Sequence, residues 1–222
     1  MKRCMRILSV ALITAGIVIL ADAGITLAWK EPLSAVYGHF KQSAAQDQLD
    51  DQAKQFLANP KVKKLGPTKD EVRRADQLAS IYAKQITDGQ GIGKIKVPSI
   101  GIDFVLIQGT ETADLQKGPG HYPTSALPGQ GKTVAIAGHR TTYLAPFRNI
   151  ADIKTGDEIE LDMPYGKFTY EVTKTDIVDP SDVSVVDEAG VERVVLTACH
   201  PLYSAAQRYV VTGELKDISL AH

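Results

Sequence analysis

The sequence predicts an all-β domain, a small barrel or sandwich, in the C-terminal part of a 222-residue chain. Three observations lead to this fold class. From Gly91 onward, seven or eight short segments either alternate apolar and polar residues or are apolar throughout. Glycine and proline separate these segments, as they commonly separate strands. Only two short stretches between them have helical character.

The N-terminal segment has the pattern of a membrane anchor. A basic flank over residues 1–6 precedes an apolar run over residues 7–29. As a helix, this run is long enough to cross about 30 Å of hydrocarbon, with Trp29 at the outer interface. The basic flank favours a cytoplasmic N-terminus, so we expect a single-pass anchor in the cell membrane and an extracellular domain. A cleaved signal peptide is the alternative, because residues 21–23 have a small-x-small pattern.

The next segment, residues 30–90, is expected to be an extracellular helical spacer that holds the domain away from the membrane. Apolar residues recur at helical spacing over residues 45–56 and 72–86. The second stretch follows Thr-Lys-Asp-Glu at residues 68–71, which has the form of a capping box. Proline-containing dipeptides break the chain between the two stretches. The alternative is that a helix of this segment packs onto the domain, or into its groove as a lid.

The predicted domain covers residues 91–217 and is followed by a tail over residues 218–222. Its predicted strands share a period of two or an uninterrupted apolar run. They cover residues 94–97, 102–108, 133–137, 157–163, 167–178, 193–199 and 207–214. Short helices are expected near residues 113–117 and 146–150. Closure into a barrel would leave so small a domain without exposed sheet edges.

Composition excludes several classes of protein. Hydrophobic residues make up 44% of the chain and charged residues 23%, close to the globular average, which excludes wholesale disorder. The formal net charge is −1 and the predicted domain is the more acidic part, so we expect no nucleic-acid partner. The two cysteines, Cys4 and Cys199, lie on opposite sides of the expected anchor and cannot form a disulfide framework.

Three residues at strand ends suggest nucleophilic catalysis. Cys199 ends an apolar strand just before Pro201, where a thiol can meet a substrate, although a strand cysteine is more often a small hydrophobic residue. His139 follows the strand over residues 133–137, and Arg208 opens the strand after Cys199. A hairpin with a loop of about seven residues would return Arg208 to the neighbourhood of Cys199. A thiol with a nearby base and cation is typical of covalent catalysis.

Three ordered motifs in this domain resemble those of the sortase family. Residues 138–147 contain Gly-His-Arg-Thr-Thr-Tyr and Ala-Pro-Phe, residues 153–159 contain a Lys-x-Gly-Asp turn, and residues 196–201 are Leu-Thr-Ala-Cys-His-Pro, with an arginine nine residues after the cysteine. The resemblance is strongest toward class E sortases of high-GC Gram-positive bacteria. The sequence departs from the family pattern at Leu144, where many relatives have glycine, and at Ala198, where threonine or serine often precedes the cysteine.

The resemblance implies a closed seven- to eight-stranded sortase-type β-barrel and a membrane-anchored cysteine transpeptidase. Cys199 would form a thioacyl-enzyme, Arg208 would stabilise the oxyanion, and His139 would transfer protons. Tyr122 and Thr197 are expected to bind substrate. The implied substrates are surface proteins with a C-terminal Leu-Ala-x-Thr-Gly or Leu-Pro-x-Thr-Gly motif, cleaved between threonine and glycine. The implied acceptor is an amino group of a lipid-linked peptidoglycan precursor, and no cofactor is expected.

Rival interpretations remain open at this stage. A pilin-polymerising or otherwise specialised sortase would use the same chemistry. A secreted cysteine peptidase would use water as the acceptor, and a catalytically silent wall-binding module would need none of the three residues. His200 is a weaker candidate for the base, because adjacent strand residues point to opposite faces. No metal is expected, since Cys199 and the histidines lack zinc-site spacing and the loop over residues 125–132 has no carboxylate.

Overall fold

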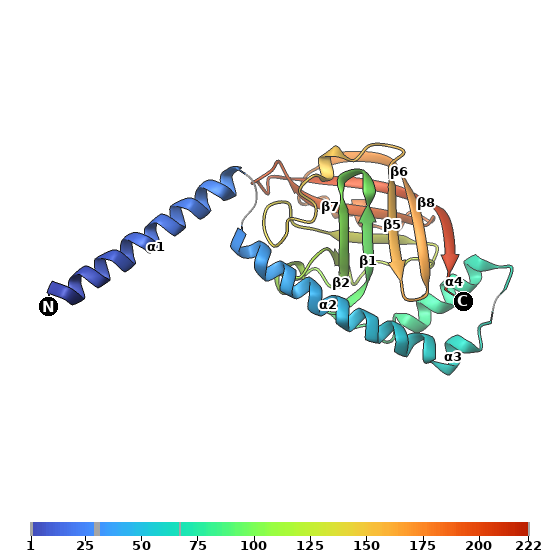
Figure 1. Ribbon diagram of the computed structural model, residues 1–222. Coiled ribbons are helices and arrows are strands. Elements are labelled where there is room, and N and C mark those ends of the chain that lie inside the picture. Colours follow the sequence, from blue (N-terminus) through green and yellow to red (C-terminus); the bar gives the residue numbers. More distant parts are fainter. Residues whose placement is uncertain (1, 29–31, 67, 222) are drawn as a thin grey trace.

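A computed structural model describes residues 2–28, 32–66 and 68–221, which form a long N-terminal helix and a β-barrel flanked by helices (Figure 1). The strands of this part of the chain form one closed barrel in the order β1-β2-β3-β4-β7-β8-β6-β5, and the pairing of β1 with β5 closes it. The predicted all-β class is confirmed. Of the two architectures left open, the structure has the barrel.

The strands lie close to the positions that the periodicity predicted. They are β1 (Gly91–Val97), β2 (Ile102–Gln108), β3 (Gly120–His121), β4 (Thr133–Ala137), β5 (Glu158–Met163), β6 (Gly166–Val178), β7 (Arg193–His200) and β8 (Gln207–Leu220). The strand β3 was not predicted, because two residues carry no periodic signal. β8 pairs with β6 as far as Leu220 opposite Gly166, so the predicted tail over residues 218–222 continues the barrel where it is described.

Helices precede the strands and connect them. They are α1 (Lys2–Ala28), α2 (Pro32–Ala58), α3 (Pro60–Lys63), α4 (Glu71–Tyr82), α5 (Thr112–Leu115) and the short 3-10 helices η1 (Pro98–Ile100), η2 (Ile150–Asp152) and η3 (Val183–Val186). The predicted capping box placed the N-cap at Thr68, two residues before the observed N-cap. Asp70 is the N-cap of α4 and accepts a hydrogen bond from the Arg73 amide, whereas Thr68 accepts one from the Asp70 amide.

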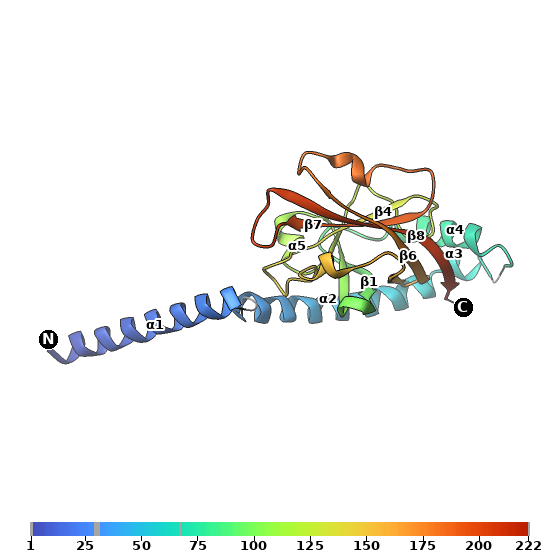
Figure 2. The same ribbon diagram turned by 90° about the horizontal axis from the view of Figure 1, so that it is seen from above.

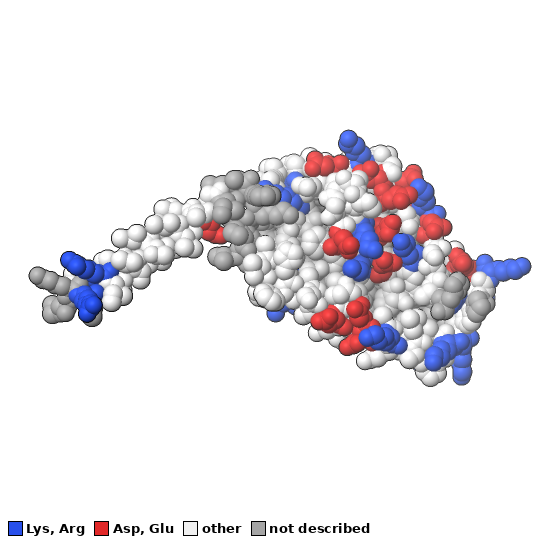
Figure 3. Space-filling view, in the orientation of Figure 1, with Lys and Arg blue, Asp and Glu red and all other residues white. Residues whose placement is uncertain are grey.

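The helix α1 extends away from the barrel in both views (Figures 1 and 2). Its segment Met5–Gly24 has a mean hydropathy of 2.2, is long and apolar enough to cross a membrane, and is not buried against the rest of the chain. Its surface is largely uncharged, with basic side chains at the N-terminal end (Figure 3). These features are compatible with the predicted anchor over residues 7–29, whereas Trp29 itself lies outside the described residues.

The helices of residues 30–90 pack on the barrel and are therefore more than a spacer. α2 lies along β1 and β2 (Figures 1 and 2), and Ala45 and Leu49 are buried against β2. The side chain of Gln42 bonds to both the amide and the carbonyl of Val105 in β2. This finding corrects the expected spacer and favours the alternative of helices packed on the domain. Helical spacing in the sequence shows an apolar face but not the surface that it meets.

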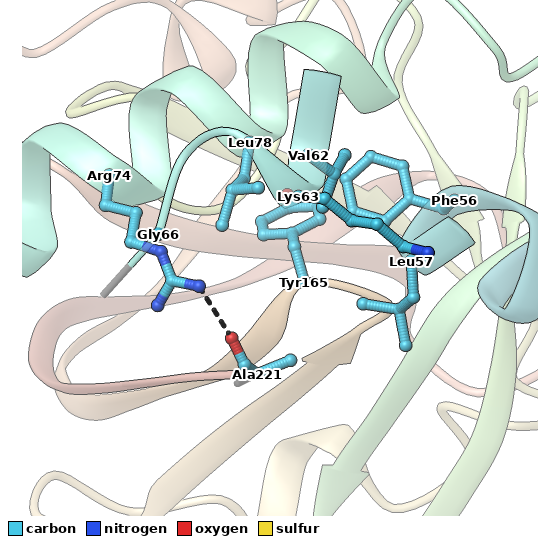
Figure 4. Close-up of a pocket in the computed structure, with 9 residues that line it drawn as sticks. All are labelled: Phe56, Leu57, Val62, Lys63, Gly66, Arg74, Leu78, Tyr165 and Ala221. Carbon is cyan, nitrogen blue, oxygen red and sulfur yellow. Dashed lines mark hydrogen bonds between the residues drawn. The ribbon is translucent and has the colours of Figure 1, made fainter. Parts of the chain in front are cut away.

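The helices α3 and α4 cover the barrel near its described C-terminal end. Tyr82 belongs to the main core, stacks edge to face on Phe56 at 5.2 Å between ring centroids, and donates a hydrogen bond to the Ile92 carbonyl. Phe56 and Tyr165 line a cavity of about 320 Å³, and Arg74, which also lines it, donates to the Ala221 carbonyl (Figure 4). These contacts make α4 part of the same folded unit as the barrel.

Candidate active site

The strands β7 and β8 form a hairpin that brings Cys199 and Arg208 together. The two strands are antiparallel, and Cys199 lies directly opposite Arg208 in their register. The connecting loop covers residues 201–206, one residue shorter than predicted. Opposite residues on one face of an antiparallel pair have Cβ atoms about 4.5–5.5 Å apart. The sheet ladder therefore places the Cβ atoms of Cys199 and Arg208 side by side.

The strand β4 supplies His139 from the other side of β7. β4 and β7 are parallel, with Ala137 opposite Thr197, so their C-terminal ends lie at the same end of the barrel. Gly138 continues the pairing by donating its amide to the Thr197 carbonyl, and His139 follows it. A Cβ atom at Gly138 would lie 2.5 Å from the Phe147 ring, so a larger residue would displace this ring.

Two cavities meet at the catalytic candidates. The first, of about 240 Å³, is lined by all five predicted site residues, namely Tyr122, His139, Thr197, Cys199 and Arg208, together with neighbouring residues. The second, of about 300 Å³, is also lined by His139 and Cys199, and by Arg140 and the β7–β8 loop. A group that enters from either cavity therefore reaches the thiol and the imidazole.

The imidazole of His139 is suited to proton transfer. It is half-buried, and burial lowers its pKa below the ordinary value of 6.5. Its Nε2 atom is buried and has no hydrogen-bond partner among the described residues. Buried polar atoms are normally paired, so this nitrogen keeps a hydrogen-bonding capacity that a role in proton transfer would use. At neutral pH the ring is mainly neutral and available as a base.

Backbone carbonyl groups of the β7–β8 hairpin hold the guanidinium of Arg208. Its Nη1 donates to the carbonyl oxygens of Ala205 and Gln207. Neither bond neutralises the positive charge, so the cation remains available to an anion that develops in the cavity. Elsewhere in the same cavity, the hydroxyl of Tyr122 and that of Thr197 in β7 are 3.1 Å apart and form a hydrogen bond. The two predicted substrate-binding residues are thus in contact with each other.

The structural role of Arg140 was not predicted from the sequence. This side chain is buried, donates to the backbone carbonyls of Cys199 and Arg148, and has Nη1 3.3 Å from Nδ1 of His200. It therefore ties the segment of His139 to the backbone of Cys199. The only signal in the sequence was its position next to His139. Because His200 faces Arg140 and lines neither cavity, its geometry does not support the role of base.

The other histidine near this end of the barrel is structural. His121 is buried, with Nδ1 2.9 Å from Oε1 of Gln108 and Nε2 2.9 Å from the Ala126 carbonyl. Burial lowers its pKa to about 4. Among the described residues, no three His, Cys, Asp or Glu side chains come together in a way that could hold a metal ion.

Comparisons with known proteins identify the family. The model of the sortase domain matches residues 95–216. The chain belongs to the sortase family. Sortase D of Bacillus subtilis (strain 168) is 33% identical over 185 residues, which cover 81% of this chain and 90% of that protein. Sortases are cysteine transpeptidases, so this sortase is an enzyme of that type.

Solved sortase structures share the fold. Sortase E from Streptomyces avermitilis is 32% identical and has a TM-score of 0.55, covering 61% of this chain and 93% of that one. Sortase E1 from Streptomyces coelicolor, solved with a tripeptide in its active site, is 26% identical and has a TM-score of 0.57, covering 60% and 91%. Relatives named as classes D and E thus both match, and the similarity to sortase D spans the larger share of this chain.

Proposed function

We propose that this sortase cleaves a C-terminal sorting motif between threonine and glycine and transfers the acyl group to an amine of a peptidoglycan precursor. The observation that carries the proposal is the cavity shared by Cys199, Arg208 and His139, in which the first two face each other across the β7–β8 ladder. A nucleophile, a cation and a proton carrier around one space are the parts that acyl transfer requires.

In the first step, Sγ of Cys199 attacks the carbonyl carbon of the threonine, and the carbonyl oxygen becomes an oxyanion. Arg208 stabilises this oxyanion through its N–H donors. His139 takes the thiol proton and gives it to the glycine nitrogen as the C–N bond breaks. The products are a thioester on Cys199 and a free amine that leaves the site.

In the second step, the acceptor amine attacks the thioester carbon and the C–S bond breaks. His139 takes a proton from the amine and returns one to the sulfur, which restores the starting enzyme. The second cavity, lined by Arg140 and the β7–β8 loop, suits the incoming amine because it also reaches the thiol. The first cavity then remains available to the acyl donor.

The orientation of the molecule supports an acceptor at the membrane surface. The β7–β8 loop lies at the end of the barrel near the start of α2, on the side from which α1 extends (Figures 1 and 2). With residues 7–29 as a single-pass anchor, this end of an extracellular domain lies close to the membrane. A lipid-linked precursor is therefore the proposed source of the amine.

The proposed sorting motif is Leu-Ala-x-Thr-Gly, with Leu-Pro-x-Thr-Gly as the alternative. The class E resemblance of the histidine and cysteine segments supports the first, as does Tyr122, whose hydroxyl bonds to Thr197 in the donor cavity. The stronger overall similarity to a sortase D leaves the choice between the motifs to experiment.

The test uses the full chain in detergent micelles with two peptides, one containing Leu-Ala-Glu-Thr-Gly and one Leu-Pro-Glu-Thr-Gly, with and without added triglycine. We expect mass spectrometry to show an adduct on Cys199 that ends at threonine, faster from the alanine peptide, and a transfer product that needs the amine. Cys199→Ala should form neither product. Equal product without the amine would indicate a peptidase, and no adduct from either peptide would overturn the proposal.

A further inference from the structure

The loop that follows His139 has a strained backbone. Tyr143, Leu144 and Ala145 are consecutive non-glycine residues with φ angles of 48°, 70° and 44°. This left-handed region is unfavourable for residues that carry a Cβ atom. Glycine adopts such angles freely, whereas leucine at position 144 does so at a cost. Strained backbone persists only where the surrounding structure holds it, so contacts with the rest of the chain must stabilise this loop.

The first turns of α2 provide these contacts. A Cβ atom at Gly38 would lie 2.7 Å from Cγ of Leu144, so Leu144 packs into a notch that exists only because residue 38 is glycine. Glycine inside a helix is otherwise unfavourable, which makes this notch a specific feature of α2. The Ser34 hydroxyl accepts a hydrogen bond of 3.2 Å from the Tyr143 amide.

Aromatic rings extend the contact to the catalytic candidate. The rings of Tyr37 and Tyr143 meet edge to face with centroids 6.2 Å apart, and the Tyr143 ring lies 5.7 Å from the imidazole of His139. Among the described residues, Nε2 of His139 has no hydrogen-bond partner that would fix the ring. The orientation of the imidazole therefore depends on packing against Tyr143, and Tyr143 in turn depends on α2.

We propose that the N-terminal turns of α2 position His139 for proton transfer, through contacts of Ser34, Tyr37 and Gly38 with residues 143–145. The three α2 residues are positioning residues, since none of them lines either cavity around Cys199. The inference rests on the proposed function of His139. Because α2 follows α1, the part of the chain nearest the proposed anchor takes part in arranging the active site.

A double-mutant cycle tests the notch. Gly38→Ala adds a methyl group that collides with Leu144, whereas Leu144→Gly removes the partner. We expect Gly38→Ala to lower kcat of the full chain by about tenfold to a hundredfold at nearly unchanged KM, because a displaced proton carrier slows chemistry more than binding. In the Leu144→Gly background, the same change should alter kcat less than twofold. Equal losses in both backgrounds, or no loss in either, would overturn the proposal.

Substitutions at Tyr37 provide a second test, because they remove side-chain atoms and do not push α2 away from Leu144. Tyr37 is 44% exposed, so its truncation should leave the fold intact. Tyr37→Ala should lower kcat, and Tyr37→Phe, which keeps the ring contact, should restore it. Phe40→Ala is the matched control, because Phe40 lies on the same helix and is 74% exposed. A loss with Phe40→Ala equal to that with Tyr37→Ala would contradict the proposed contact.

A spectroscopic measurement separates this inference from the proposed function. The chain has five histidines, so 13C-labelled imidazoles give few signals, and His139→Gln assigns the relevant one. Gly38→Ala should shift the His139 signal in the wild-type background and not in the Leu144→Gly background. If the shifts follow this pattern while neither sorting peptide reacts, the positioning contact stands and the substrate proposal fails. If the peptides react and the signal does not move, the positioning contact fails alone.

Discussion

The two halves of the candidate site are held in different ways. Cys199 and Arg208 face each other because the β7–β8 ladder fixes their register along two long strands. His139 lies beyond the end of β4, before a strained loop that packs on α2. Regular sheet hydrogen bonds hold the first half, and Arg140 adds a bond to the Cys199 carbonyl. The second half depends on contacts with a helix far away in the sequence, so the same site combines a rigid part with a part open to adjustment.

The largest expected effect on activity comes from changing Arg208, in the half of the site that the β7–β8 ladder holds. Arg208→Ala should lower the rate of acyl transfer by about 10²–10³-fold, the range found on removal of one oxyanion donor. The stability of Arg208→Ala should differ little from wild type, because among the described residues the guanidinium donates to the carbonyls of Ala205 and Gln207 within its own hairpin. Steady-state kinetics with the sorting peptides and thermal unfolding measure the two effects. Arg208→Lys is the matched control for charge, and activity of Arg208→Ala close to wild type would remove this residue from the mechanism.

The next effect in size concerns the pH dependence of stability, for which His121 and His139 are compared. Burial lowers the pKa of His121 to about 4 in the folded chain, whereas the unfolded chain keeps the ordinary value near 6.5. The unfolded state therefore binds more protons in this window, and stability falls as the pH drops from 6.5 toward 4, by about 3 kcal/mol.

Urea unfolding of wild type and His121→Gln at several pH values measures this effect. Between pH 6.5 and 4, the free energy of unfolding should fall much less for His121→Gln than for wild type. His139→Gln should remove a smaller part, because His139 is only half-buried and burial therefore disfavours its charged form less than that of His121. Parallel pH curves for wild type and His121→Gln would show that His121 is not buried in its neutral form.

The smallest expected effect concerns the substrate-binding pair. Tyr122→Phe removes the hydroxyl that bonds to Thr197 and should cost about 1 kcal/mol of stability. If this pair shapes the donor cavity, the preference between the alanine and proline sorting peptides should narrow, while the rate of Cys199 alkylation stays unchanged. Competition between the two peptides, followed by mass spectrometry, measures the preference. An unaltered preference would limit Tyr122 to packing.

The sequence predicted the half of the site with Cys199 and Arg208 better than the half with His139. Alternation and apolar runs located seven of the strands, and the spacing of Cys199 and Arg208 gave the hairpin, because strand pattern and hairpin register are local properties. The two-residue strand β3 was missed because it is too short to have a period. Arg140 was missed as a structural residue because its partners, the carbonyls of Cys199 and Arg148, are backbone groups that any sequence supplies.

The sequence by itself determined the apolar N-terminal run, the all-β class, the positions of seven strands along the chain and the motifs that carry Cys199, His139 and Arg208. Only the tertiary structure decided that the barrel closes, that the helices of residues 30–90 pack on it, and that Leu144 sits against Gly38. The physical reason is the range of the interactions. Periodicity records which face of an element is apolar, whereas the surface that covers this face depends on the whole fold.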